Sequence, residues 1–463
     1  MNDSAGLDGS LEQNVPVTSD ATVTPDTPET EKRGFLTGRV LAWSFWDWGS
    51  AAFNAVIITF VFSVYLTNAD LFGEKANTYY GWTISIAGII VALVAPAIGQ
   101  WTDKTGKRRT VLNIATSVLI VLMALLFVVK PGMLWIGLIL IGLGNIIFEI
   151  GEVVYNSMVG EMSRPGTVGR VSGFGWGMGY VGGIVLLLIL YIGFIAPDVG
   201  WFGITSDDGM NIRFSMLICA AWTLIFSLPL MLIARDGEPN GAVSTGVIGA
   251  YREVVRSIKR FWRSDRSVVW FLISAAIYRD GLAGVFSFGG VLAAAGFGFS
   301  SSEVMIFGIA ANLVAGIATI AFGLLDDFWG ARKVIITSLI AMIVAAMAVF
   351  FFHAGGKVIF WVFGLLLCVF VGPVQSASRS YLSRIAPPGG ETELFGLYAT
   401  CGRAVSFLAP FLYSTAITLG AAWTGVGLAK AGHWGIIGIA LVLLLGLLTF
   451  LPISRTAHDK TAQ

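Results

Sequence analysis

The sequence predicts an all-α membrane protein of twelve membrane-spanning helices in two parallel six-helix halves. Three observations support this prediction. The mean hydropathy of +0.80 and a charged fraction of only 12% lie outside the range of soluble chains, in which about a quarter of residues are charged. Twelve apolar stretches have lengths close to the ~20 residues that cross a bilayer core. A loop motif also occurs twice, about half the folded length apart.

The predicted spans follow one another with short loops. The first 34 residues are acidic and rich in Thr, Ser and Pro, so we expect a disordered cytoplasmic tail over 1–34 and no signal peptide. An N-terminal bundle over 35–234 and a C-terminal bundle over 268–453 hold six spans each, and a cytoplasmic tail follows at 454–463. The spans run at about 40–66, 79–101, 110–129, 133–159, 170–196, 213–234, 268–295, 303–325, 333–353, 357–383, 393–420 and 431–453.

Between the bundles, 235–267 is the longest predicted cytoplasmic loop. Apolar residues fall on one helical face within it and basic residues on or beside the other, which is typical of an amphipathic helix on an anionic membrane surface. A helix that binds a partner protein is the alternative interpretation. The apolar face consists of Val247, Tyr251, Val254, Val255, Ile258, Phe261 and Trp262, and the basic residues are Arg252, Arg256, Lys259, Arg260 and Arg263.

The distribution of Lys and Arg predicts the orientation, because positively charged loops are retained in the cytoplasm. With the N-terminus inside, the cytoplasmic segments hold 21 of these residues and the outer segments hold five. Both termini are therefore expected in the cytoplasm. The remaining three, Arg279, Arg379 and Arg403, fall inside spans, where a cation is costly enough that it normally faces a partner or a wet cavity.

The loop motif has the pattern G-x3-D-x2-G-x-R-[RK]. Its first copy begins at Gly99 after the second span, and its second copy begins at Gly323 after the eighth span, at an offset of 224 residues. A second pair of segments supports the repeat, because 164–166 before the fifth span corresponds to 387–389 before the eleventh at an offset of 223. Since six spans return the chain to its starting side, the halves are parallel repeats.

The doubled motif resembles the signature of the major facilitator superfamily, and longer strings are similar to its branch named for the fungal vacuole effluxer. The resemblance covers about 35–455. It implies a secondary transporter of two six-helix bundles, with a central cavity that opens alternately to either side and a role in exporting amino acids. The fungal member acts at the vacuole. The strings are Trp46 to Trp48, Phe148-Glu149 with Tyr155-Asn156, Arg170 to Trp176, Tyr278 to Gly281, Gln375 to Tyr381, and Phe395 to Arg403.

Each copy of the motif places a carboxylate at the end of a span. Asp103 is placed to face the positive N-terminus of a helix in the opposite half, and Asp327 is its symmetry mate. Gly99 and Gly323 permit close helix approach. The resemblance implies that this cluster is a latch that holds the cytoplasmic side closed, whereas the alternative is a set of topology-setting charges. The turn glycines are Gly106 and Gly330, and the basic residues, which can pair with carboxylates or lipid phosphates, are Arg108, Arg109, Arg332 and Lys333.

Acidic residues lie inside the spans of the first half, and basic residues lie inside those of the second. An acidic wall that faces a basic wall suits a zwitterion, whose ammonium and carboxylate need opposite partners. The alternative is that these charges pair with one another and only join the halves. The first set is Asp47, Glu149 and Glu152. The 223-residue offset places Gln375, Arg379 and Arg403 opposite Glu152, Asn156 and Tyr180, and Arg279 and Asp280 complete the second set.

Glu149 is the first candidate for a proton carrier, because burial in the membrane favours the neutral form of a carboxylate and so permits protonation and release within a transport cycle. Asp47 is the second candidate. Glu152, about one turn away on the same helical face, would act on Glu149 through like-charge repulsion. Further polar residues that can line a cavity are Asn54, Asn145, Tyr155, Asn156, Trp176, Tyr180, Gln375 and Tyr398.

The predicted function is secondary transport of a small polar solute. Amino-acid export is the first candidate, and the alternatives are proton-coupled transport of a sugar, peptide or drug, or a non-transporting receptor or scaffold. An enzyme, a metal site and a cofactor are not expected, because the three histidines lie at span ends or in the tail and no Gly-x-Ser-x-Gly motif occurs. The net charge of +1 argues against nucleic-acid binding. The expected partners are the solute, protons and the lipid bilayer, with the chain a monomer in a bacterial cell membrane, or in a vacuolar membrane if it is fungal.

Overall fold

The computed structural model describes residues 35–453, except 74–75, 165, 239–251, 253–255, 257, 264–265, 300 and 428–430. The predicted tails at 1–34 and 454–463 therefore lie outside the described residues. So do Val247, Tyr251, Val254 and Val255, which make up most of the apolar face predicted for the linker helix. Residues 258–263 of that linker are helical, with Phe261 buried and Trp262 exposed.

The first half contains six spans. Its first span is composite, because α1 continues through a π-helix (η1) into the short α2. Short helices α3 (Ala69–Phe72) and α7 (Val159–Met162) connect longer ones. The elements that cross are α1 (Gly38–Ala51) with η1 (Ala52–Phe60) and α2 (Phe62–Leu66), α4 (Ala76–Thr105), α5 (Arg108–Leu125), α6 (Leu134–Ser157), α8 (Val168–Leu190) and α9 (Met210–Ile233).

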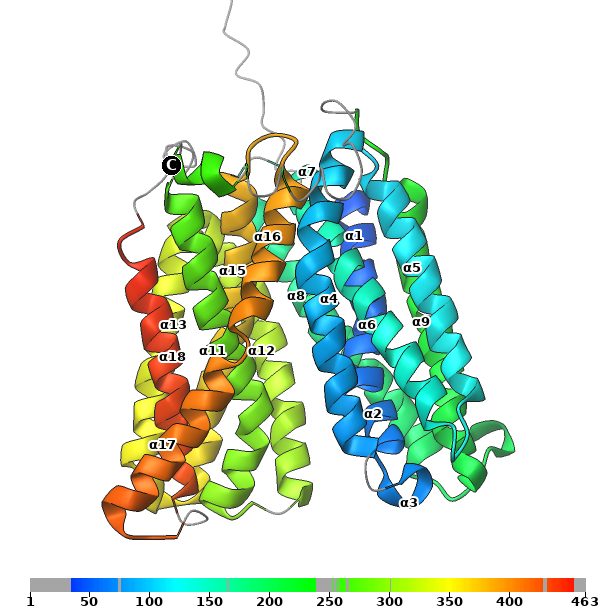
Figure 1. Ribbon diagram of the computed structural model, residues 1–463, viewed down its shortest axis with the longest axis vertical. Coiled ribbons are helices and arrows are strands. Elements are labelled where there is room, and N and C mark those ends of the chain that lie inside the picture. Colours follow the sequence, from blue (N-terminus) through cyan, green and yellow to red (C-terminus); the bar gives the residue numbers. More distant parts are fainter. Residues whose placement is uncertain are drawn as a thin grey trace, which may run out of the picture. The chain divides into compact units, whose positions relative to one another are not determined.

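The second half repeats this arrangement. Two helices, α16 and α17, together make its fifth span, Glu391–Thr424. In Figure 1 the helices from α1 to α9, coloured blue to green, lie together, and those from α11 to α18 lie together beside them. The second-half elements are α11 (Arg266–Phe297), α12 (Ser301–Trp329), α13 (Ala331–Phe351), α15 (Leu365–Ile385), α16 (Glu391–Val405), α17 (Leu408–Thr424) and α18 (Gly435–Phe450).

The prediction of an all-α membrane protein is confirmed. Twelve helices are long and apolar enough to cross a membrane, and all regular elements of the described residues are helices. Their outer faces are apolar, as lipid contact requires: on α5, the exposed residues Ile114, Val118, Val121 and Leu125 recur every three or four positions and so form one stripe. The chain is therefore an integral, multi-pass membrane protein.

The two halves meet at the side of the protein where the two loop motifs lie, which we call the loop-motif side. There α4 packs against α16, and α8 packs against α12 (Figure 1). A side chain at Gly99 would collide with the backbone of Thr392, and one at Gly323 would collide with the backbone of Gly169. The two glycines therefore permit the backbones of opposite halves to approach closely.

The apolar core is shared unequally between the two ends of the protein. One cluster of buried residues contains members of both halves, and its first-half members, such as Trp43, Val91 and Met158, come from the loop-motif side. A second cluster, which includes Phe53, Phe62 and Leu190, lies toward the other end and contains first-half residues alone. Apolar packing therefore ties the halves together near the loop motifs.

Candidate transport site and gate

Arg379 on α15 reaches across the boundary between the halves. Its side chain is buried, with 3% of it exposed. Nη1 donates to Oδ1 of Asn156 on α6 at 2.8 Å. Nε donates to Oγ of Ser172 on α8 at 2.9 Å, and Nη2 donates to the backbone oxygen of the same residue at 2.5 Å. One cation of the second half is therefore held by two helices of the first half.

Asp47 on α1 is the ionic partner of Arg379. Its Oδ2 lies 3.7 Å from Nη1 of Arg379 and accepts a hydrogen bond of 3.3 Å from the hydroxyl of Tyr155. The rings of Trp43 and Trp176 lie 4.8 and 5.6 Å from the guanidinium carbon, within the range of cation–π attraction. The guanidinium of Arg379 thus lies between aromatic rings, and the carboxylate of Asp47 beside them balances its charge.

A second ion pair crosses between the halves. Nη2 of Arg403 on α16 pairs with Oε1 of Glu149 on α6. The arginine side chain is 32% exposed and the glutamate side chain 20% exposed, so both groups keep contact with space that solvent can enter. This pair is therefore easier to break than the enclosed Asp47–Arg379 pair.

Glu152 and Arg279 have no ion pair or charged hydrogen-bond partner within the described residues. Both side chains are half-buried. The guanidinium of Arg279 stacks on the ring of Tyr398 at 4.1 Å and makes a long contact of 3.5 Å with the backbone oxygen of that residue. Glu152 lies within electrostatic reach of the carboxylates of Glu149 and Asp47 and of the guanidinium groups of Arg279 and Arg379.

The remaining predicted residues fall outside this arrangement. The carboxylate of Asp280 is buried and accepts a hydrogen bond of 2.5 Å from the backbone N–H of Ala409, so it caps α17. The ring of Tyr180 packs against that of Trp176 in a tilted arrangement, with centroids 6.2 Å apart. Gln375 is half-buried, Asn54 is exposed, and neither contacts Arg379, Glu149 or Arg403 among the described residues.

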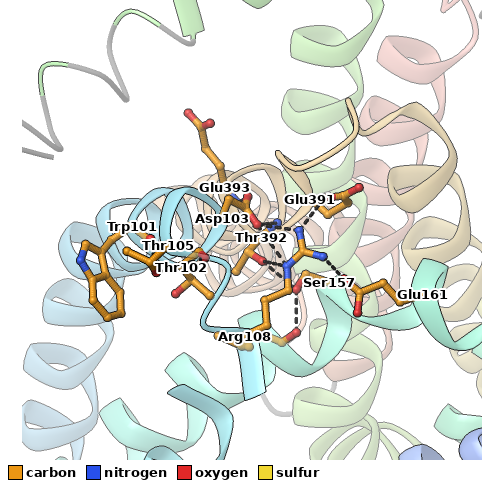
Figure 2. A network of polar contacts seen from close by, with 11 residues as sticks. Trp101, Thr102, Asp103, Thr105, Arg108, Ser157, Glu161, Glu391, Thr392 and Glu393 are labelled. Carbon is orange, nitrogen blue, oxygen red and sulfur yellow. Dashed lines mark hydrogen bonds and ion pairs between the residues drawn. The ribbon is translucent and has the colours of Figure 1, made fainter. Parts of the chain in front are cut away.

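The first copy of the loop motif builds a polar network across the halves (Figure 2). Asp103 accepts hydrogen bonds from the backbone N–H groups of Thr392 and Glu393 at 3.1 and 2.7 Å, at the start of α16. Arg108 donates to the same carboxylate at 2.7 Å and to Glu391 at 2.5 Å, and it also pairs with Glu161. One arginine thus joins three carboxylates and the N-terminus of a helix.

The second copy caps a helix in the same way. Asp327 accepts hydrogen bonds from the backbone N–H groups of Gly169 and Arg170 at 2.8 and 3.2 Å, at the start of α8. Two cations complete this network: Arg170, on the capped helix itself, lies 3.0 Å from Asp327, and Arg384, at the end of α15, contacts Asp326 at 2.6 Å and Asp327 at 3.4 Å. Arg332, the arginine at the motif position, instead donates to backbone oxygens at the end of α18.

The other residues of the motif have local roles. Gly106 and Gly330 adopt positive φ angles of 67° and 83°, which favour glycine, and so turn the chain between spans. Nε of Arg109 donates to the backbone oxygen of Met231, and Lys333 is exposed. Within the part of the chain that the structure describes, no group of three or more His, Cys, Asp or Glu side chains could hold a metal ion.

Several residues of the networks were not anticipated from the sequence. Two of them carried a usable signal, because Asp326 adjoins the motif aspartate and Glu391 lies in the first turn of a span, where acidic residues favour a helix N-terminus. Ser172 gave no signal beyond its place in a glycine-rich span. The unanticipated residues are Glu161, Ser172, Asp326, Arg384, Glu391 and Thr392.

Solved transporter structures share this fold. The proton:xylose symporter XylE aligns with a TM-score of 0.67 at 13% identity, over 91% of this chain and 96% of that one. The fucose:proton symporter FucP of E. coli aligns with a TM-score of 0.67 at 14% identity, over 90% and 98%. Identities this low establish the fold and not the substrate. Together with the twelve spans, this likeness shows that the chain has the fold of the major facilitator transporters.

Sequence comparisons identify the family. The family described as "Vacuole effluxer Atg22 like" matches residues 63–419, which is most of the chain, so the protein belongs to that family. The "Uncharacterized MFS-type transporter YxiO" of Bacillus subtilis is 24% identical over 431 residues, covering 91% of this chain and 96% of the relative. "Autophagy-related protein 22-1" of Neosartorya fischeri is 26% identical over 273 residues, and the match covers 52% of this chain but only 42% of the fungal protein.

Proposed function

We propose that this protein is a secondary active transporter that exports a small polar solute, in the first instance an amino acid, by alternating access. One observation supports this mechanism above the others. The halves are joined on the loop-motif side by contacts that can break and re-form, namely two carboxylate caps on helix N-termini and the ion pairs of Arg108 with Glu391 and of Arg170 with Asp327. Such contacts suit a gate, because they are specific in geometry and need no covalent change to open.

The loop-motif side is the cytoplasmic side in this proposal, as the distribution of Lys and Arg predicts. A state in which Asp103 and Asp327 hold their helices is then closed to the cytoplasm. Opening requires both carboxylates to leave α16 and α8, so that the halves rock apart at this side and together at the other. This orientation places both termini in the cytoplasm, and a bacterial cell membrane is the membrane of residence in this proposal, since the relative that is matched over 96% of its length is bacterial.

Proton coupling has a physical basis at Glu149. While its carboxylate is ionised, it holds Arg403 of the other half; protonation removes that charge and releases the pair. Because both side chains are partly exposed, a proton can reach the carboxylate without unfolding the surrounding helices. Protonation of Glu149 would thus weaken one of the ties between the halves and bias the equilibrium between the two open states.

Amino-acid export is supported by two features. Carboxylates on α1 and α6 face arginines on α11, α15 and α16, which provides both charges that a zwitterion needs. The family is described as a vacuole effluxer, which favours export from a compartment over uptake. The relative in B. subtilis has no substrate in its name, so the choice of solute rests on the charges.

Counterflow into proteoliposomes tests the proposed function. Vesicles containing purified protein would be preloaded with one unlabelled solute and diluted into the same labelled solute, using each of the twenty amino acids, several sugars and dipeptides. We expect trans-stimulated uptake of one or more amino acids. Stimulation by sugars or dipeptides alone would point to the alternative solutes. If no solute gave counterflow, alternating-access transport would be excluded in favour of a receptor or scaffold.

The proton-carrier role has its own test. Glu149→Gln should abolish uptake driven by an imposed pH gradient and leave counterflow intact, because exchange needs no net proton movement. The matched control is Glu303→Gln, which removes a similar ion pair, that of Glu303 with Lys357 at 2.8 Å, from an exposed position. Undiminished pH-driven uptake by Glu149→Gln would remove that residue from the coupling mechanism.

A further inference from the structure

Apart from Asp280, which caps α17, the charged residues that we predicted to face a cavity fall into two groups. Asp47, Glu149, Arg379 and Arg403 are committed to the two ion pairs that cross between the halves. Glu152 and Arg279 are not paired with any residue of opposite charge in the part of the chain that the structure describes. Ionic groups at membrane depth are costly to leave unpaired. Two unpaired groups of opposite sign therefore call for a ligand that satisfies both.

The placement of Glu152 directs it toward the second half. On α6, Glu149 lies three positions before it and Asn156 four positions after it, so the three side chains form one stripe of the helix. Both flanking residues reach second-half arginines, because Glu149 pairs with Arg403 and Asn156 accepts from Arg379. Glu152 lies between these two cross-half contacts, on the face that looks toward the other half.

Arg279 faces the same space from the opposite side. It lies on α11, and its guanidinium stacks on the ring of Tyr398, a residue of α16, the helix that also carries Arg403. Stacking fixes the plane of the guanidinium, and one long contact to a backbone oxygen leaves most of its N–H donors unused. A planar, fixed fork of this kind is suited to a carboxylate, which it can bind through two parallel hydrogen bonds.

The surroundings support a ligand and not a hidden ion pair. Both side chains are half-buried, so each keeps part of its surface exposed. The amide nitrogen of Asn145, which lies on the same stripe of α6 one turn beyond Glu149, is buried and has no hydrogen-bond partner among the described residues. The same holds for the indole nitrogen of Trp176 beside Arg379. Uncompensated donors in the same region are expected where a bound molecule completes the hydrogen bonding.

We propose that Glu152 binds the ammonium group and Arg279 the carboxylate of a zwitterionic solute, while the Asp47–Arg379 and Glu149–Arg403 pairs join the halves and do not contact the charges of the solute. The proposal rests on the proposed transport function and specifies its recognition step. Because the two binding groups come from opposite halves, a bound zwitterion bridges the halves, as a solute must if its binding is to drive their relative movement.

A crossed set of substrates and variants tests this assignment. L-alanine is the probe, because it carries both charged groups with a small side chain; N-acetyl-L-alanine lacks the ammonium group and L-alaninamide lacks the carboxylate. Each compound would compete with counterflow of labelled L-alanine in proteoliposomes. We expect the unmodified protein to reject both derivatives at least tenfold relative to L-alanine.

The variants should lose discrimination in opposite directions. Glu152→Gln should accept N-acetyl-L-alanine nearly as well as L-alanine and still reject the amide. Arg279→Gln should do the reverse, and Arg279→Lys, which keeps the charge without the fork, should still reject the amide. Glu303→Gln is the control and should behave as the unmodified protein does. Ligand-induced thermal stabilisation in detergent, measured for the same compounds, reports binding by variants that fold but do not transport.

Three results would overturn the proposal. Unchanged discrimination in both glutamine variants would show that other residues bind the charges. An identical loss of all binding in both variants, with normal folding, would show that neither group distinguishes ammonium from carboxylate. Counterflow of sugars in place of L-alanine would reject a zwitterion site and leave alternating-access transport standing, whereas the absence of counterflow for every solute would reject the transport function itself.

Discussion

Both copies of the loop motif cap a helix of the opposite half, but the cations that balance the capping aspartates come from different positions. In both, an aspartate at the end of a span accepts hydrogen bonds from the first N–H groups of a helix in the opposite half: Asp103 on α16 and Asp327 on α8. The cation differs. In the first copy it is the motif arginine, Arg108, whereas in the second the aspartates pair with Arg384, which comes from α15, and with Arg170, which lies on the capped helix α8.

The offset between the halves explains this exchange. By the 223-residue offset, Arg384 occupies the position of Glu161, and by the 224-residue offset, Asp326 occupies the position of Thr102. The first network thus has its cation in the motif and an anion on α7, while the second has an extra anion in the motif and its cations on α15 and α8. The comparison teaches that the helix cap is the repeated element, and that balancing charge can come from any neighbour within reach.

Removal of Arg108 should have the largest effect on the free energy that closes the loop-motif side. Arg108→Gln leaves Asp103, Glu161 and Glu391 close together without a cation, which we expect to weaken closure of the loop-motif side by about 3 kcal/mol. Arg332→Gln, at the matching motif position, should leave closure unchanged, because within the described part of the chain that arginine donates to backbone oxygens just after α18, in its own half. Spin labels at Lys107→Cys and Lys333→Cys, both exposed, would report the distance between the halves. Equal effects of the two substitutions would contradict the conclusion that Arg108, but not Arg332, stabilises the closed state.

The second-largest loss of closure is expected from a methyl group at Gly169, beside the second copy of the motif. An added Cβ there would lie 2.6 Å from the side chain of Asp326, which is buried and held by Arg384 and Ser380. Gly169→Ala should therefore cost about 2 kcal/mol of closure through overpacking. The matched control is Gly166→Ala, where no atom lies within 4 Å of the added group; its positive φ of 76° means that only local loop strain is expected. The same spin-label pair would measure both variants.

The two capping aspartates should respond alike. Asp103→Asn and Asp327→Asn each keep a carbonyl that can accept one backbone N–H but lose the charge that strengthens both hydrogen bonds, so each should weaken closure by about 1.5 kcal/mol. Equal shifts in the spin-label distance distribution would show that the caps, and not their cations, are equivalent. A shift confined to one variant would mean that a single cap holds the gate.

Thr392 should give the smallest effect. Its hydroxyl accepts a hydrogen bond of 2.9 Å from Arg108 and contacts Ser157 at 2.9 Å, but the position that matches it in the other half is Gly169, which has no side chain. Thr392→Ala should therefore weaken closure by about 1 kcal/mol or less, because it removes one charge-assisted contact and leaves the cap intact. A larger effect than that of Asp103→Asn would show that the Thr392 hydroxyl contributes more to closure than the capping carboxylate does.

The fold could be predicted almost completely from the sequence, because bilayer thickness fixes the length of a span and hydropathy marks its position. The intramembrane arginines were also identifiable, since Arg379 and Arg403 lie within apolar runs. Which carboxylate each arginine meets could not be predicted, because helix rotation and the packing of two halves decide it. Asp280 illustrates this limit: its position resembles that of a cavity residue, yet its carboxylate caps α17.

The matched caps also set a kinetic requirement. If both must be released in one rocking step, their contributions to the activation barrier add, and two contributions of ~2 kcal/mol would slow each conformational turnover by roughly a thousandfold. A bound solute must therefore lower that barrier through contacts that it makes in the transition state of the conformational change. Empty protein would then cross slowly, which is the property that keeps an exchanger from leaking when no cargo is bound.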